Sequence, residues 1–398
     1  MRFIMLTALI EMVTIGLIIP VLPVLVGNFT DSLAAQAFWY GAVMFTFAVA
    51  NFFGSPILGA LSDRYGRRPI LLLGFCGLAV SLFVTALATQ LWMLIAVRLV
   101  SGALMANMSV ANAYVADISA PADRARRFGQ LGAMIGMGFI LGPAMGGLLG
   151  GIDIRLPFFV AGSLALLNLL YGYFVLPESL PPERRRAVGW AAGNPLSSLR
   201  ALSRLEGIGN LVAVIGLGSL AQFTLQTSWV LYTTFRFGWG PQDNGWSLFT
   251  VGLASVLVQG VLLRRMLARF GNERLAIIGL VSSTLCFLLW GLSTEGWMMY
   301  ALIACNLFGF AVVPAIQSMV SNAADARTQG QTMGAVASLN SLASVLAPVI
   351  GAPLLGVVSH LPRTDWRVGA PFFFCAALQL AATLMALRHF RSKKSVPA

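Results

Sequence analysis

Long apolar runs separated by short polar gaps occupy almost the whole chain. A helix needs about 20 apolar residues to cross the hydrocarbon core of a bilayer. The runs lie at residues 3–26, 38–61, 70–88, 91–115 and 128–150, a sixth ends near Leu176, and six more follow at 208–235, 244–263, 275–293, 297–322, 331–358 and 370–387. The pattern therefore predicts an all-α polytopic membrane protein with twelve transmembrane helices in two six-helix bundles.

The two halves resemble each other at a fixed offset. When the sequence is shifted by 205 positions, Gly66 aligns with Gly271, each after an Arg-aromatic pair, and Pro143 aligns with Pro348. A six-plus-six repeat around a pseudo-two-fold axis is a transporter architecture in which substrate binds at the midplane between the halves. We expect an N-terminal bundle at 1–176, a cytoplasmic linker rich in Pro, Arg and Ser at 177–207, a C-terminal bundle at 208–387 and a cytoplasmic tail at 388–398.

Composition and charge placement agree with a membrane protein. Hydrophobic residues make up 58% of the chain and charged residues only 10%, far below the share in soluble domains. The net charge of +12 could suggest nucleic-acid binding, but 21 of the 26 basic residues fall at the two termini and in the loops after every second run. The positive-inside rule then places both termini in the cytoplasm, and we expect a lipid bilayer rather than a nucleic acid as partner. The first run is too long for a cleavable signal and contains an acid.

One acid lies deep inside an apolar run. Of the fourteen acids, only Glu11 does so, and it shares a helical face with Thr7 and Thr14. An ionisable side chain at mid-span costs about 2.5 to 3.5 kcal/mol on insertion scales, so Glu11 is a candidate for binding a transported proton. A structural Glu that is hydrogen-bonded within the bundle is the alternative. Arg98, the one basic residue within a span, begins a second polar stripe that includes Asn112, and we expect it to act on Glu11 directly or through water, or else to cap neighbouring carbonyl groups.

Two glycine-containing motifs stand out. Residues 59–69 read GALSDRYGRRP in a turn between runs, where Gly59 and Gly66 permit close approach or left-handed backbone. In the fifth run, small residues at Gly138, Gly142, Gly146 and Gly147 surround Pro143, which removes a backbone donor and favours a kink. Ordinary explanations exist for both, since cytoplasmic turns gather Arg and small residues permit tight helix packing.

The spacing G-x-L-x-D-R-x-G-R-R-P resembles the signature of the major facilitator superfamily. The fifth-run motif is similar to one that marks its proton-coupled antiporters, and residues 15–23 resemble the first-helix signature of the twelve-helix drug/proton antiporters. FRFGW at 235–239 and STEGW at 293–297 point to the tetracycline/proton antiporter branch. The resemblance implies a conformational latch, in which Asp63, Arg67 and Asp117 form the charge pairs; its motif residues are Gly59, Asp63, Arg64, Gly66, Arg67, Arg68 and Asp117. It also implies that Arg98 helps proton transfer.

The departures from that branch concern titratable groups. Where tetracycline antiporters carry acids in the third and ninth helices and a His in the eighth, this chain has Ser81, Ser283 and Ser255. Gln259 and an acid at Glu11 are retained, and Asn51 replaces a Gln. Export of a metal–tetracycline cation is therefore open to question, and proton coupling would depend on the first half of the chain.

The superfamily fold implies that the first, fourth, seventh and tenth helices line the cavity. Polar and aromatic residues at helical spacing occur there, and each could instead hydrogen-bond between helices. Uncharged lining of this kind suits an amphipathic or neutral organic molecule. The substrate-cavity candidates are Asn51, Asn112, Gln222, Gln226, Trp229, Gln259, Asn306, Phe310 and Gln317.

The sequence thus predicts proton-coupled efflux of small amphipathic compounds by alternating access, from a monomer in the bacterial cytoplasmic (inner) membrane. Alternatives are a proton-coupled importer or metabolite exchanger of the same fold, and a membrane sensor or scaffold that does not transport. The sequence shows no nucleophile–base pair, metal-ligand cluster or phosphate-binding loop, so we expect neither an enzyme nor a metal or cofactor. The identity of the substrate is left open.

Overall fold

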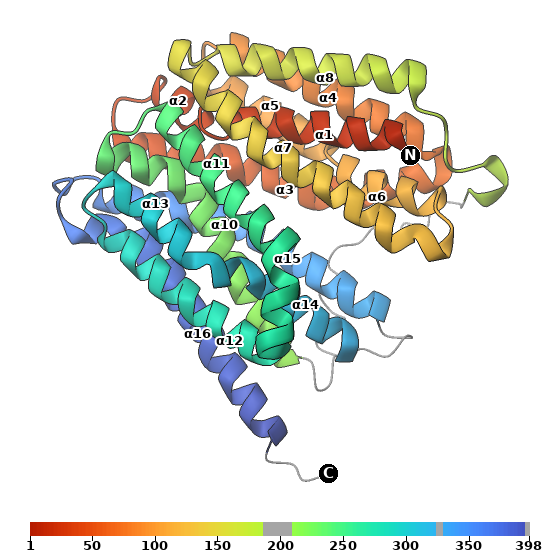
Figure 1. Cartoon of the computed structure of the whole chain (residues 1–398). Coiled ribbons are helices and arrows are strands. Elements are labelled where there is room, and N and C mark those ends of the chain that lie inside the picture. The colour runs from red at the N-terminus through yellow and green to blue at the C-terminus, as the bar shows by residue number, and fades with distance from the viewer. Residues whose placement is uncertain (186–208, 324–328, 395–398) are drawn as a thin grey trace. The chain divides into compact units, whose positions relative to one another are not determined.

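The computed structural model describes residues 1–185, 209–323 and 329–394, which contain helices and connecting turns but no β-strand. The first part holds α1 (Arg2–Ile18), α2 (Leu22–Gly27), α3 (Leu33–Tyr65), α4 (Arg67–Leu87), α5 (Leu91–Leu104), α6 (Asn107–Asp117), α7 (Arg124–Ile152) and α8 (Leu156–Val175). The rest holds α10 (Gly209–Phe237), α11 (Pro241–Leu257), α12 (Leu263–Leu292), α13 (Gly296–Cys305), α14 (Val312–Ala323), α15 (Gln329–Val358) and α16 (Ala370–Lys394) (Figure 1).

The protein is a multi-pass membrane protein. Eleven helical stretches in the described ranges are long and apolar enough to cross a bilayer. One of them, Pro241–Leu292, is 52 residues long and is interrupted at Gly271, where φ is +70°. A stretch of that length exceeds what one crossing requires, and the interruption falls in the gap between the predicted eighth and ninth spans. The count of twelve crossings and the cytoplasmic termini stay predictions.

The chain divides into two compact units. Unit 1 consists of Met1–Ser32, Ala42–Pro195 and Gly240–Phe249, and unit 2 consists of Leu33–Gly41, Leu196–Trp239 and Thr250–Ala398. In unit 1, α1 packs against both α7 and α8, and α4 packs against α8 (Figure 1). In unit 2, α10 packs against α15 and α16. Most of the predicted linker, residues 186–207, lies outside the described residues.

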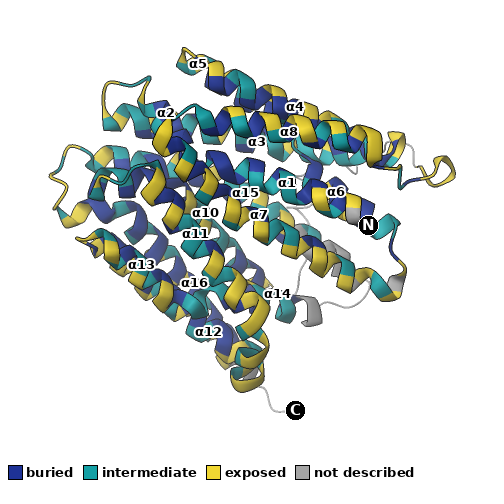
Figure 2. Cartoon of the chain, turned by 45° about the horizontal axis from the view of Figure 1, so that its top comes forward, coloured by how far each residue is buried: buried dark blue, intermediate teal, exposed yellow. Residues whose placement is uncertain are grey.

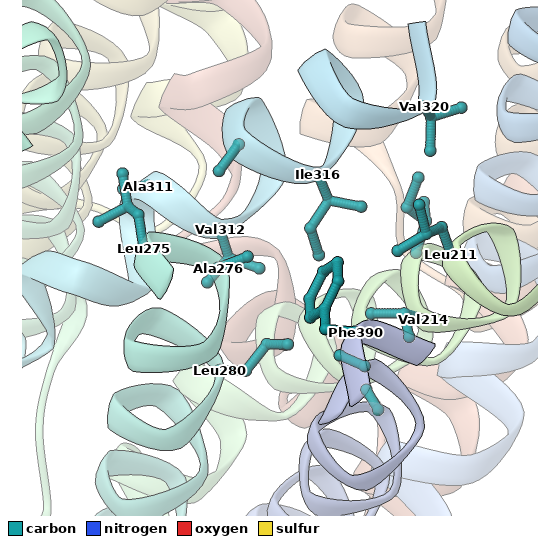
Figure 3. Packing of buried hydrophobic residues seen from close by; sticks show 14 of the residues in the cluster. Leu211, Val214, Leu275, Ala276, Leu280, Ala311, Val312, Ile316, Val320 and Phe390 are labelled. Atoms are coloured by element: carbon teal, nitrogen blue, oxygen red, sulfur yellow. The ribbon is translucent and has the colours of Figure 1, made fainter. Parts of the chain in front are cut away.

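Both units have apolar interiors and apolar exposed faces. A buried cluster in unit 2 brings Leu211 and Val214 of α10 together with Leu280 of α12 and Phe390 of α16 (Figure 3). Buried and exposed positions alternate around each helix (Figure 2). Large apolar side chains such as Phe174 are also exposed, as expected for helices that face lipid.

The predicted repeat has structural counterparts at the same offset. Gly66 and Gly271 both adopt positive φ, at +105° and +70°, and Pro143 and Pro348 both lie inside long helices. A third pair was not expected. The fourth span breaks between α5 and α6, and the tenth span passes through a 3-10 turn at Asn306–Ala311, 205 residues after residues 101–106.

Candidate functional site

Glu11 lies on α1 with only 3% of its surface exposed. Its Oε1 accepts a hydrogen bond of 2.7 Å from Nδ2 of Asn107, the first residue of α6. Thr7 and Thr14 are buried on the same face of α1 and donate to the carbonyl groups of Ile4 and Ile10 within their own helix. The polar stripe expected from the sequence is therefore buried inside unit 1, and the carboxylate of Glu11 is hydrogen-bonded to the side-chain amide of Asn107.

The break between α5 and α6 lies beside this acid. Met105 leaves helical geometry at φ −88° and ψ 77°, and the regular i to i+4 hydrogen bonding ends there, with the Met105 N–H group donating to the Gly102 carbonyl oxygen at 3.2 Å. Nδ2 of Asn51 on α3 donates to the carbonyl oxygen of Met105 at 2.5 Å and to that of Gly102 at 3.5 Å. The expectation of one continuous polar stripe from Arg98 to Asn112 is wrong, because the two residues belong to different helices.

A cavity of about 390 Å³ opens at the break. Its walls come from α1, α3, α6 and the break itself, and its lining residues are Glu11, Met12, Phe47, Asn51, Ser55, Met105, Ala106, Met108, Ser109 and Asn112. Two of the candidate cavity residues, Asn51 and Asn112, are therefore in its wall. The volume lies within the range of small-molecule sites, and a mostly apolar wall with a few polar groups is typical of them.

Arg98 is buried on α5, and its guanidinium lies 5.7 Å from the centre of the Phe47 ring. Phe47 also lines the cavity, so Arg98 lies next to a residue of its wall. The hydrogen bond recorded for the Glu11 carboxylate comes from Asn107, and an action of Arg98 on Glu11 stays a proposal.

The small residues of α7 form the surface on which α1 packs. A Cβ atom on Gly142 would lie 2.6 Å from the Cα of Gly16, and one on Gly138 or Gly146 would collide with Met12 or Leu17. Such close approach requires glycine on the facing helix. A Cβ on Gly147 would lie 2.8 Å from the Cα of Gly245, in the segment Gly240–Phe249 of the same unit. The helix runs without interruption through Pro143.

The turn between α3 and α4 is organised around one guanidinium. Arg67 contacts Asp63 at 2.5 Å and Asp117 at 3.1 Å, and it donates to Oγ of Ser62 at 2.7 Å. The three charges that the family resemblance singled out thus meet in unit 1. In the second half, Ala268 stands 205 positions after Asp63.

The other residues of this motif have different surroundings. Arg64 is exposed and lies 5.1 Å from the centre of the Tyr65 ring, and Arg68 donates to the carbonyl group of Tyr173. Gly66 has φ +105°, as the expected left-handed backbone requires. Gly59 does not fit its expectation, because it is helical and a Cβ there would meet nothing within 4 Å.

Glu178 is a functional candidate that the sequence interpretation missed. Its carboxylate accepts from the backbone N–H groups of Arg67 at 2.8 Å and Arg68 at 3.2 Å, at the N-terminus of α4, and from those of Ser179 and Leu180. An anion at a helix N-terminus satisfies unpaired donors and the helix dipole. The sequence feature that could have pointed to Glu178 is its position in Pro-Glu-Ser, directly after the sixth span.

The predicted cavity residues of unit 2 are dispersed. Gln222 and Gln226 are exposed on α10, whereas Trp229 is 3% exposed and packs edge-on against Trp290 at 5.2 Å. The indole of Trp229 is thus buried among aromatic rings, and its assignment to a cavity wall stays a prediction. Gln259 donates to Ser255 at 2.9 Å on the exposed side of a π-helical turn at Val258–Leu262.

In the tenth span, the three predicted residues do not share one α-helical face. Asn306 and Phe310 lie in the 3-10 turn and Gln317 lies in α14, because the turn changes the angular step between residues. Oδ1 of Asn306 accepts from Ser283 at 3.3 Å. Ser283, where the family resemblance implies an acid, donates a hydrogen bond to Asn306.

An all-helical membrane protein with repeated halves, broken spans and a partly polar cavity is a secondary transporter by architecture. The sequence profile described as Major Facilitator Superfamily matches residues 4–348 and 211–398. The chain belongs to the major facilitator superfamily, and it is a transporter rather than an enzyme.

Characterised relatives and solved structures agree with this assignment. The chain is 36% identical to the class C tetracycline resistance protein of Escherichia coli, and the alignment covers 92% of each chain. It is 30% identical to the class B tetracycline resistance protein of the same species, and that alignment covers 95% of this chain and 94% of the relative. Among solved structures, the nucleoside transporter NupG (D323A mutant) matches with a TM-score of 0.78 at 16% identity over 98% of this chain and 99% of that one. The D-xylose-proton symporter matches with a TM-score of 0.73 at 18% identity over 97% of each chain. These structures establish the fold alone.

Proposed function

We propose that this transporter exports small amphipathic organic compounds in exchange for protons, by alternating access, as a monomer in the inner membrane of a bacterium. The observation that carries the proposal is Glu11, a buried carboxylate that lines a cavity of drug-like size and lies opposite a broken helix. A carboxyl group in that position can bind a proton from one side and release it to the other. The relatives named as tetracycline resistance proteins favour a drug as substrate.

One coupling carboxylate implies about one proton per cycle. A charge moving through 100 mV supplies about 2.3 kcal/mol, and a tenfold proton gradient adds about 1.4 kcal/mol. Together, about 3.7 kcal/mol sustains a substrate gradient on the order of 500-fold for a neutral compound. A monovalent cation would exchange without net charge movement, and a dication would be exported poorly.

The lining supports an apolar or singly charged molecule with aromatic character. Met12, Met105 and Met108 contribute three flexible, polarisable side chains that suit aromatic rings of varied shape. Ser81, Ser255 and Ser283 stand where tetracycline antiporters carry titratable groups, so we expect the metal–tetracycline complex to be a weaker substrate here than in those relatives.

The test is drug efflux from a pump-deficient bacterium and proton-driven uptake by everted vesicles, with tetracycline and the monocationic dye ethidium as probes. Glu11→Gln is expected to abolish proton-driven transport of both at unchanged expression. Glu295→Gln, the same change at an exposed carboxylate outside the spans, serves as the matched control. Full activity of Glu11→Gln would rule out this coupling site, and probe movement with the proton gradient would indicate an importer.

A further inference from the structure

The side chain of Asn107 joins the acid to the helix break. Asn107 is the first residue of α6, is 2% exposed, and donates from Nδ2 to Oε1 of Glu11 over 2.7 Å. A hydrogen bond to an ionised carboxylate is stronger than one to a neutral carboxyl group. The first turn of α6 is therefore attached to α1 by a contact whose strength depends on the charge of Glu11.

The other end of the same amide is left unsatisfied. Oδ1 of Asn107 is buried without a hydrogen-bond partner among the described residues. The amide lies against Gly74 of α4, where a Cβ atom would collide with Oδ1 and lie 2.8 Å from Nδ2. A half-turn of the amide would place its N–H groups against Gly74 instead, and burying an unpaired donor there is no better. The hydrogen bond to Glu11 thus sets which end of the amide faces the acid, and the contact with Gly74 leaves the side chain little room to move.

Protonation of Glu11 changes the balance at this amide. A charge-assisted hydrogen bond is roughly twice as strong as a neutral one. With Glu11 charged, the strong bond compensates for the unsatisfied Oδ1; with Glu11 neutral, the bond weakens while the cost at Oδ1 is unchanged. The first turn of α6 is then attached to α1 less strongly, through apolar packing with Ile4 and Ala8 and a weaker hydrogen bond. The break at Met105 separates α6 from α5.

We propose that Asn107 is the positioning residue through which the protonation of Glu11 sets the conformation of the α5–α6 break. The inference rests on the proposed role of Glu11 and adds the device that transmits its charge. The repeat provides a contrast: Val312 occupies the position 205 residues after Asn107, and a Cβ on Gly279 would meet Val312 at 2.5 Å. The second half has the same packing without the amide, just as it has Gly216 in place of Glu11.

Few other charged groups can account for a pH response here. The parts of α4, α7 and α8 after residues 69, 128 and 156 contain no Asp, Glu, Lys, Arg or His. On α6 the charged residue is Asp117, and on α3 the charged residues are Asp63 and Arg64. Both carboxylates are paired with Arg67, and Arg64 is exposed. Arg98 on α5 faces the Phe47 ring. The uncharged titratable groups of these elements are Tyr114 of α6, Cys76 of α4, and Tyr171 and Tyr173 of α8.

The experiment measures maleimide labelling of Ser109→Cys, just after the break, in full-length protein in nanodiscs with the four native cysteines replaced by Ser. Because thiol reactivity rises with pH by itself, each rate is divided by that of the same protein carrying Glu11→Gln. At about pH 8 this ratio is expected to be about one fifth, the factor that corresponds to about 1 kcal/mol, and at about pH 5 about 1. Asn107→Val should bring the ratio to about 1 at both pH values. Asn112→Cys provides a second labelling position.

Asn168→Ala is the matched control. Asn168 on α8 is 1% exposed, donates to the Thr7 carbonyl group of α1 at 3.1 Å, and also has an unsatisfied Oδ1, but it contacts no acid. This variant should keep the Glu11-dependent ratio. The proposal is overturned if Asn107→Val keeps the ratio, if Asn168→Ala loses it as well, or if the unmodified protein shows none. Labelling requires no substrate, so this experiment tests the link between Glu11 and the break independently of whether the protein exports the tested drugs.

Discussion

Nε of Arg67 lies 3.1 Å from Oδ2 of Asp117, the last residue of α6. The first residue of the same helix, Asn107, holds Glu11. Eleven residues of α-helix therefore connect the buried acid to the charged turn between α3 and α4. A short rigid helix transmits a displacement at one end to the other, so we interpret α6 as the element that relates the proton site to the latch motif.

The two carboxylates on Arg67 should contribute unequally to stability. The Asp63 side chain is 48% exposed and that of Asp117 is 23% exposed, so solvent screens the first contact more. Asp117→Asn is expected to lower the free energy of unfolding by about 1.5 kcal/mol, and Asp63→Asn by less than about 0.5 kcal/mol. Thermal unfolding in detergent measures both. Equal losses would mean that exposure does not govern these pairs.

Glu178 should stabilise the start of α4 through its carboxylate oxygens. Because four backbone N–H groups converge on it, Glu178→Ala is expected to cost about 1 to 2 kcal/mol, as the loss of a helix cap does. Glu178→Gln keeps one acceptor and should cost roughly half as much. Glu183→Ala, at an exposed position on the same connection, is the control. The comparison uses fluorescence-detected thermal unfolding, and an Ala variant at Glu178 as stable as the control would contradict the capping role.

Gly66 and Gly271, the two positive-φ glycines that are 205 residues apart, give a prediction within the repeat. An L-residue at positive φ costs roughly 1 to 2 kcal/mol wherever it lies. Gly271→Ala adds little else, because its Cβ would meet nothing within 4 Å, whereas a Cβ on Gly66 would collide with the Glu178 carboxylate. Gly66→Ala should therefore unfold at the lower temperature and yield less folded protein. The reverse order would show that strain at Gly66 is relieved by movement of Glu178.

The α1–α7 contact predicts a sharp difference between two glycines of one helix. Gly142→Ala brings a methyl group to 2.6 Å from the Cα of Gly16, where only backbone could yield. A Cβ on Gly132 meets nothing within 4 Å, so Gly132→Ala should be neutral or slightly stabilising through helix propensity. Yield of monodisperse protein by size-exclusion chromatography distinguishes the two. A normal yield for Gly142→Ala would indicate that the helices can separate without loss of folding.

Some features of the site could be predicted from the sequence, because they depend on local rules. Apolar run length gave the spans, a lone acid in such a run gave Glu11, and the need for glycine in a turn gave the conformation of Gly66. The break at Met105 could not be predicted. Leu104, Met105 and Ala106 all favour helix, and the carbonyl group of Met105 accepts a hydrogen bond from Asn51, which is 54 residues away in sequence.

Tertiary packing decides what helical spacing leaves open. Helical spacing placed Trp229 on the face of Gln222 and Gln226, but spacing does not show which side chains of that face are exposed and which are buried against another helix. Trp290 and Phe372 surround the indole. Glu178 was overlooked for a related reason, since its partners at the start of α4 are more than 100 residues away in sequence.

The contact between Gly74 and Asn107 gives a prediction that tests the fixed orientation of the amide. A methyl group on Gly74 would collide with the Asn107 side chain, so Gly74→Ala alone should lower the free energy of unfolding by about 1 to 3 kcal/mol, as overpacking does. Combined with Asn107→Ala, which removes the colliding atoms, the same methyl group should cost at least about 1 kcal/mol less, a coupling typical of residues in contact.

Gly77→Ala is the control for this prediction. Its Cβ would meet Cδ1 of Leu104 at 2.5 Å, so its penalty should not depend on residue 107. The three single variants, the two double variants that combine Asn107→Ala with Gly74→Ala or Gly77→Ala, and the parent are compared by thermal unfolding in one detergent. Additive losses at positions 74 and 107 would mean that α4 does not hold the amide, and the coupling of Glu11 to α6 would then require another restraint.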